Sequence, residues 1–437
     1  MHLTMALFYR ELKDNMSCKK IIELLSAAAE FKEDLTWKNS DTMSVPTLFN
    51  SIRPFIDEIS GEKFELSRRY TAPYAVKAFC LLNAHLYRYQ IPVDCDMLQD
   101  QQFVVQKSLV LLNGLMQICL ARGWVSCMKN CIATSQLIVQ AIPETGHQLL
   151  QLPYVNHAEA KEFKNRKRNI KSVKEFLTLA DADRKIGMNH VTEEEFNEVV
   201  RIAHAFPSVE FSSVKPMVLG YDEIVCGSII TLQVRLYLAR ICNNSEIAEL
   251  ESDGVKPSTP TNPGANEFQS NFQMDEDGNV IEGEDFSSSK FIYAPPTEES
   301  FIQGKSPIFI HAPYFYSDRT PSWWIIVSDD ENDFVCAPKK ITNLPLQETA
   351  SPSTNFGRLV TFQFPAPKKP ATLRYTVTVK GDFSIGFDLM KDLKIPVVEE
   401  PKEYIQHGIG SKASGKRAKI AEYEGLTEDD DEDSFNL

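Results

Sequence analysis

The spacing of apolar residues changes near Ser208, and this change constrains the fold more than any other feature. Between Ser228 and Leu238 every second residue is apolar, with Thr231, Gln233 and Arg235 between them. Such alternation is typical of a strand with one buried face. Similar runs follow at 308–310, 323–327, 334–336, 360–364, 373–379 and 393–397. Roughly seven or eight short strands separated by turns predict an antiparallel sandwich of the immunoglobulin or fibronectin type. The cysteine pair of true immunoglobulin domains is not evident, which favours the fibronectin-like variant.

The residues before Ser208 are spaced as in helices. In residues 1–147, apolar side chains recur every three or four positions, as at Phe79, Leu82 and Leu86. This period is that of an amphipathic helix with one face in a core. Residues 1–147 are therefore predicted to form a helical domain.

A second, smaller helical unit is predicted for residues 148–207. Its first residues, 149–155, resemble the opening of a helix-hairpin-helix, and Thr192 with Glu195 predicts a capping box before a helix that Pro207 ends. The predicted fold class is thus α+β and multidomain, with an N-terminal helical domain, a helix-hairpin-helix-like unit and a C-terminal fibronectin/immunoglobulin-like β-sandwich over residues 208–400.

Two segments have the composition of disordered chain. Residues 243–289, inside the predicted sandwich, are rich in Ser, Pro, Gly, Asn and acidic residues and poor in periodic apolar ones. Residues 401–437 end in an acidic run that is predicted to bind a basic partner: Glu428, Asp429, Asp430, Asp431, Glu432 and Asp433. Thr427 directly precedes these acids and suits an acid-directed kinase, whose phosphate would add roughly −1.5 to −2 charges.

Composition excludes several classes. The net charge of −14 disfavours a general nucleic-acid binder, because phosphate contacts need a clustered positive field. The basic residues between Lys161 and Lys174 are interpreted as a solvated face, with an RNA or acidic-protein contact as the alternative. The most apolar stretch, 109–121, is about 13 residues long, whereas a membrane span needs roughly 20, so the sequence predicts a soluble chain.

The chain is not expected to be an enzyme. The histidines have no metal-ligand spacing, and neither a Gly-x-Ser-x-Gly elbow nor a phosphate-binding glycine loop occurs. Cys127 and Cys131 are one helical turn apart, but no second pair lies near them in sequence, so a buried helix face is the preferred interpretation. The nine cysteines are scattered and are expected to be reduced structural thiols. We therefore predict no catalytic, cofactor-binding or metal-binding residues and no cofactor.

Four segments of the last third carry a family resemblance. They are 321–327, which begins with a tryptophan pair, 362–367, which ends in Pro-Ala-Pro, 375–379 and 383–388. In this order they resemble the β-domain that closes members of the Sec-sixty-three family, the J-protein subunit of the endoplasmic reticulum translocon. The residues that define these strands are predicted to be structural: Trp323, Trp324, Phe362, Phe364, Pro365 and Tyr375.

The resemblance implies a function. It implies a non-enzymatic scaffold on the cytosolic face of the endoplasmic reticulum membrane, which contacts the translocon channel in post-translational protein translocation. It also implies a second partner, a translocon-associated membrane protein with a basic cytosolic segment that meets the acidic tail, and it implies no small-molecule substrate.

The resemblance leaves one alternative and one departure. The alternative is an accessory module of a spliceosomal RNA helicase that binds RNA or splicing factors. The departure is that translocon members carry membrane spans and a lumenal J domain with a His-Pro-Asp motif, which this sequence is expected to lack as a partial or shortened form.

Overall fold

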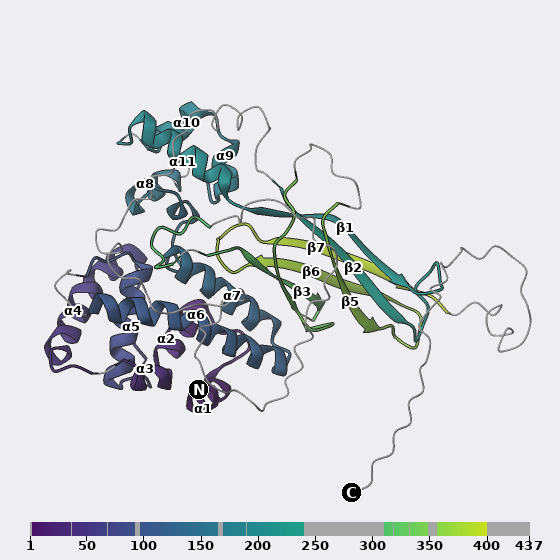
Figure 1. The fold of residues 1–437 in the computed structure, drawn as a ribbon, viewed down its shortest axis with the longest axis horizontal. Coiled ribbons are helices and arrows are strands. Elements are labelled where there is room, and N and C mark those ends of the chain that lie inside the picture. The colour runs from purple at the N-terminus through teal and green to yellow at the C-terminus, as the bar shows by residue number, and fades with distance from the viewer. Residues whose placement is uncertain are drawn as a thin grey trace, which may run out of the picture. The chain divides into compact units, whose positions relative to one another are not determined.

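The computed structural model describes residues 2–35, 37–67, 69–91, 97–164, 169–188, 190–239, 310–317, 319–331, 333–347 and 356–399. Residues 1–398 form one compact unit. The predicted insertion 243–289 and acidic tail 401–437 lie outside the described residues. Within the unit, helices precede two antiparallel sheets, which confirms the predicted mixture of a helical N-terminal region and C-terminal sheets (Figure 1).

The first part of the chain is helical, as its apolar period predicts. Its helices are α1 His2–Glu11, α2 Cys18–Ser26, α3 Ala29–Glu33, α4 Asp41–Ser60, α5 Pro73–Leu86, α6 Met97–Arg122 and α7 Val125–Gln140. Pro73 is the first residue of α5. An N–H at this position makes no intrahelical hydrogen bond, so proline, which lacks one, costs the helix nothing there. Helices α6 and α7 form a hairpin that turns at Gly123, whose positive φ of 77° suits glycine.

Three of these helices meet at a buried ion cluster. The ammonium of Lys77 on α5 lies 2.7 Å from a carboxylate oxygen of Asp41 on α4 and 2.7 Å from one of Asp100 on α6. The Lys77 side chain is fully buried. Because removing one partner would leave an uncompensated buried charge, this cluster fixes how α4, α5 and α6 pack together.

Helix α6 is longer than the apolar stretch 109–121 that it contains. By length and composition it could cross a membrane. More than half of the residues in its most apolar 18-residue window are buried inside the protein, as in the central helix of a helical core.

A second group of short helices follows. It comprises η1 Gln148–Gln151, α8 His157–Phe163, α9 Val173–Thr178, α10 Asp181–Ile186 and α11 Glu193–Ala205. The capping box of Thr192 and Glu195 is confirmed: the Thr192 side chain accepts from the Glu195 N–H, and the Glu195 carboxylate accepts from the Thr192 N–H. Helix α11 ends two residues before Pro207, as predicted. These helices surround their own core, which includes Phe163 and Phe176.

The strands form two antiparallel sheets. Their bounds are β1 Ser208–Val218, β2 Ile229–Ala239, β3 Ser322–Asp329, β4 Lys339–Thr342, β5 Arg358–Pro365, β6 Ala371–Gly381 and β7 Leu389–Val397. One sheet has the order β1-β2-β5 and the other β4-β3-β6-β7. Aromatic rings bridge them, with Phe364 of β5 edge-to-face against Tyr375 of β6 at 5.4 Å. A single core runs through both sheets and into the N-terminal helices.

The predicted strands at 228–238, 323–327, 360–364, 373–379 and 393–397 are confirmed, and the one at 334–336 is wrong. Of the predicted run 308–310, residues 308 and 309 lie outside the described residues. Residues 334–336 form only an isolated bridge between Phe334 and Ser328. The neighbour of β3 is instead β4, whose sequence Lys-Lys-Ile-Thr has one apolar residue and gives no alternating signal. An edge strand that buries a single side chain cannot be found from alternation.

The tryptophan pair divides between the two faces of β3, as alternation requires. Trp323 is 3% exposed and meets Phe383 edge-to-face at 5.5 Å, whereas Trp324 is partly exposed beneath the ammonium of Lys340. Phe362 and Phe364 are buried, and Pro365 ends β5.

We predict that Trp323→Ala lowers the free energy of unfolding by roughly 3–5 kcal/mol, because it leaves a cavity in the core. Trp324→Ala should have a clearly smaller effect. Chemical denaturation of both variants measures the difference, and equal losses would contradict the assignment of faces.

Candidate functional site: the junction of helices and sheets

The loop that joins β6 to β7, residues 382–388, is the point where the helices meet the sheets. Here we call it the junction loop. It lies against α7 and η1, and its side chains enter both cores: Phe383 belongs to the main core and Phe387 to the core of the short helices. A loop that enters a protein interior must satisfy its backbone polar groups with protein partners.

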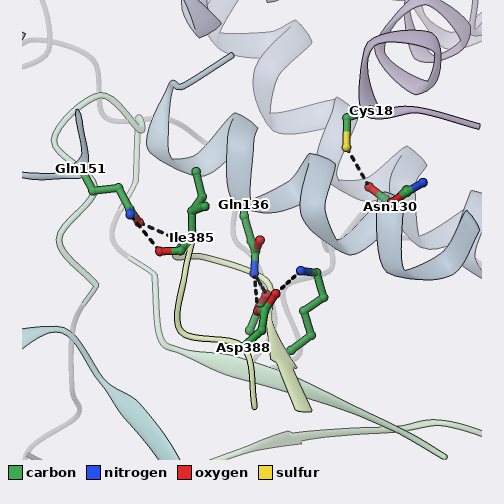
Figure 2. Close-up of polar contacts among 8 residues, drawn as sticks. Cys18, Asn130, Gln136, Gln151, Ile385 and Asp388 are labelled. Carbon is green, nitrogen blue, oxygen red and sulfur yellow. Dashed lines mark hydrogen bonds and ion pairs between the residues drawn. The ribbon is translucent and has the colours of Figure 1, made fainter. Parts of the chain in front are cut away.

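Two consecutive residues of α7 bind the start of the junction loop. The Ser135 hydroxyl donates to the carbonyl oxygen of Asp382 at 2.9 Å. The Gln136 side-chain amide donates to the carbonyl oxygen of Gly381 at 2.7 Å and to a carboxylate oxygen of Asp388 at 3.0 Å (Figure 2). The Lys380 ammonium pairs with the other oxygen of Asp388, so both ends of the loop are tied together.

Two further glutamines bind the middle of the loop. The Gln140 amide, one turn beyond Gln136 on α7, donates to the carbonyl oxygen of Phe383 at 2.8 Å and to that of His311 at 3.1 Å. Gln151 forms a two-way pair with the backbone of Ile385, donating to its carbonyl at 2.9 Å and accepting from its N–H at 2.8 Å (Figure 2). The helices therefore supply donors and acceptors that a neighbouring strand would otherwise supply.

The end of the loop docks on the short helices. The Phe387 ring stacks on Phe206 at 5.2 Å, and the Lys174 ammonium lies 5.4 Å from the Phe387 ring centroid. Gly386, with a φ of 88°, lets the backbone pass against Gln148: a Cβ there would lie 2.2 Å from the Gln148 side-chain oxygen. A larger residue would displace the Gln148 side chain, and the positive φ would strain any residue other than glycine.

Charges gather on the sheet side of the junction. The carboxylate of Asp382, which is almost fully buried, accepts from the Ser322 hydroxyl at 2.7 Å and lies 3.4 Å from Arg319 and 3.5 Å from Lys340. A buried carboxylate needs such partners. Asp382 thus links the junction loop to β3, to β4 and to the segment before β3.

A second contact region involves the segment 310–317. The Tyr316 ring stacks on the imidazole of His85, and the Tyr316 hydroxyl donates to the side-chain oxygen of Gln101 at 2.9 Å. His85 donates through Nε2 to the carbonyl oxygen of Ile138 at 2.7 Å. Burial lowers the pKa of His85 from 6.5 to about 4, so the imidazole is neutral at neutral pH.

Cys127 and Cys131 are both buried on α7, which confirms the buried helix face. The structure adds Cys119 on α6, which sequence reasoning missed: the sulfur atoms of the three lie within 4.8 Å of one another. The α6–α7 hairpin brings Cys119 across from Cys127, and a prediction of this hairpin at Gly123 could have found the cluster. The seven cysteines among the described residues are free thiols, as expected.

The basic cluster and the acidic tail are placed only in part. Of the basic cluster, which was interpreted as a solvated face, Lys161, Lys164 and Lys171 are exposed, and Lys174 packs over Phe387. Residues 166–168 lie outside the described residues. Thr427 and the acids 428–433 lie outside the described residues. Sequence reasoning missed the junction residues Ser135, Gln136, Gln140 and Gln151, because a buried polar residue on a helix can be recognised only from its partner.

Comparison with known proteins shows the family of the chain. The family model of the Sec63 Brl domain matches residues 1–393, and the chain therefore belongs to the Sec63 family. The mouse Translocation protein SEC63 homolog is 24% identical over 88% of this chain and 63% of its own length. The Translocation protein sec63 of Schizosaccharomyces pombe is 25% identical over 67% of this chain and 42% of its own.

The same region also occurs in helicases. The Drosophila melanogaster U5 small nuclear ribonucleoprotein 200 kDa helicase is 21% identical over 89% of this chain, but over only 14% of its own length. The chain spans less than two thirds of the length of the mouse relative.

We predict that Gln140→Leu lowers the free energy of unfolding by about 1–3 kcal/mol, because the carbonyl oxygens of Phe383 and His311 lose a buried donor. Gln117→Leu is the matched control, since Gln117 is exposed on α6. Thermal and urea unfolding measure the difference. Equal stability of the two variants would show that the glutamine does not hold the loop.

The pKa of His85 predicts acid sensitivity. Because the folded pKa is below the unfolded value, the neutral imidazole contributes stability that is present above pH 6.5 and lost as the pH falls towards 4. His85→Gln, which keeps a side-chain donor, should reduce the loss of unfolding free energy between these pH values by up to about 3 kcal/mol. Parallel pH profiles for both chains would refute the assignment.

Proposed function

We propose that this protein is a non-enzymatic scaffold of the endoplasmic reticulum translocon, which contacts the channel from the cytosolic side of the membrane during post-translational translocation. Family membership supports a translocon-associated role. The observation that carries the scaffold role is the junction loop, because its hydrogen bonds and aromatic contacts hold helices and sheets in one fixed arrangement. A scaffold that positions a partner needs such rigidity.

We propose that residues 1–400 comprise three parts. Residues 1–147 and the helix-hairpin-helix-like residues 148–207 form a helical base, and the fibronectin-like sandwich of 208–400 presents its loops to the channel. The sandwich assignment rests on two packed antiparallel sheets. The base and the sandwich then act together, because the junction loop binds both.

The channel-binding surface that we propose is the hairpin end of β1 and β2. Strand β1 begins directly after α11 and runs away from the helices (Figure 1). Large apolar side chains are exposed at its far end: Leu219 is 90% exposed and Ile229 63% exposed, with Met217 beside them on β1. Exposed apolar groups gathered at one place favour a protein contact. The occupant that we propose is a cytosolic loop of the translocon channel.

We predict that Leu219→Asp combined with Ile229→Asp abolishes co-purification with the detergent-solubilised channel. Met43→Asp is the matched control, since Met43 is exposed on α4, away from the hairpin. All variants should unfold at the temperature of the parent. Co-purification of the double variant at the parental level would overturn the proposed surface.

The acidic tail is proposed to bind the basic cytosolic segment of a second translocon-associated membrane protein. A chain that ends at Leu426 should lose most of its affinity for such a segment at low salt, and binding by the intact chain should weaken steeply towards physiological salt because the charges are screened. A titration at both salt concentrations measures this. Equal affinities of the two chains would leave the tail with a solubilising role only.

The second candidate function is an accessory module of a spliceosomal RNA helicase. It is favoured by the similarity to the Drosophila helicase over most of this chain. The translocon proposal is preferred because the match covers 63% of the mouse SEC63 homolog but only 14% of the helicase, and because the sequence carries acidic segments. Co-purification with a splicing helicase instead of the channel would reverse this preference.

A further inference from the structure

Three cysteines from two helices converge in the helical base, in a cluster that the scaffold function does not use. Cys119 lies near the end of α6, and Cys127 and Cys131 lie one turn apart in the first half of α7. All three side chains are fully buried, and their sulfur atoms lie within 4.8 Å of one another. The three-sulfur cluster is thus a triangle of soft ligand atoms in the buried interior.

The local structure holds this triangle in place. The αL conformation of Gly123 ends α6, and the N–H of Trp124 donates back to the carbonyl oxygen of Cys119 at 2.9 Å. This closure is that of a helix C-terminus stabilised by glycine, and it sets the position of Cys119 opposite α7. The thiols therefore come together through the fold of the hairpin.

Thiolates in this position have a source of stabilisation. Cys127 is the third residue of α7, where the unpaired N–H groups of the helix start favour negative charge.

We propose that Cys119, Cys127 and Cys131 form a buried three-thiolate site for a soft d10 metal ion, and that the site prefers Cu(I) to Zn(II). Thiolates select Cu(I), Zn(II) and iron–sulfur clusters. Structural Zn(II) sites are closed by four ligands. No fourth cysteine, histidine or carboxylate joins the three sulfur atoms among the residues that the structure describes. A three-coordinate ion satisfies this ligand set, whereas Zn(II) would lack its fourth ligand.

The ion would act on the junction through α7. That helix carries Cys127 and Cys131 in its first half and the junction residues Gln136 and Gln140 in its second. Binding to the folded chain alone raises the stability of the fold by mass action. Bridging Cys119 to α7 would therefore stiffen the helix that holds the junction loop.

The test uses the full-length chain under anaerobic conditions. The purified chain is analysed for metal content and titrated with Cu(I) in competition with a Cu(I) chelator, and separately with Zn(II) in competition with a Zn(II) chelator. We expect one Cu(I) per chain, ultraviolet absorption from thiolate-to-copper charge transfer, a rise in Tm on binding, and weaker retention of Zn(II). X-ray absorption at the copper edge should show three sulfur neighbours.

Variants separate the site from its surroundings. Cys127→Ala and Cys119→Ala should lose Cu(I) affinity by at least about 100-fold and lose the rise in Tm, since two ligands remain of three. Cys80→Ala is the matched control, a fully buried thiol outside the cluster, and should bind as the parent does. Circular dichroism establishes that each variant is folded, and Cys131→Ala replaces any that is not.

Several outcomes would overturn the proposal. The site is refuted by equal Cu(I) affinity of Cys127→Ala and Cys80→Ala, by the absence of bound metal in the parent, or by a disulfide among the three cysteines in the isolated chain. Tighter retention of Zn(II) than of Cu(I) would refute the stated preference.

Discussion

The fold depends on how the backbone of the junction loop is satisfied. The loop follows β6 and packs between α7, η1 and the other short helices, where its carbonyl groups need hydrogen-bond donors from the protein. Ser135, Gln136, Gln140 and Gln151 provide the missing partners. A buried polar group that keeps its partner contributes modestly to stability, but one that loses it carries a penalty of about 1–3 kcal/mol. The junction is therefore stable only when the helices hold these side chains opposite the backbone groups of the loop.

The helical base supports this arrangement by fixing α7. The ion cluster at Lys77 locks α4, α5 and α6 together, and α6 is joined to α7 by their hairpin. Arg88, just after α5, donates to the carbonyl oxygens of Gln140, Ala141 and Leu150 and so holds the end of α7 and the start of η1. Each of these contacts removes a way in which α7 could shift. These contacts connect α7, which binds the junction loop, to the rest of the helical base.

The elements of the fold were predictable where one physical signal dominates. Alternation indicated β2, β3, β5, β6 and β7. The helical period indicated the N-terminal helical region with α5, and the capping box indicated α11, because burial of one face fixes the pattern of residues. Strand β4 was not predicted because it buries only one side chain and therefore shows no alternation. The junction contacts could not be predicted for another reason. Gln136 and Gln140 have the same residue type as exposed Gln117, and they differ from it only in the distant loop that they bind. The cysteine cluster likewise depends on a contact between two helices.

The central claim is that helices and sheets form one rigid body through the junction loop. Native-state hydrogen exchange, followed by mass spectrometry of peptides from α7, the junction loop, β3 and β6, tests it most directly, because exchange reports the opening free energy of each segment separately. If the account holds, the slowest amides in all four segments exchange with the same opening free energy, and Gln140→Leu lowers that value in all four together. Sheets that open at a distinctly lower free energy than α7 would show two bodies in contact and contradict the account.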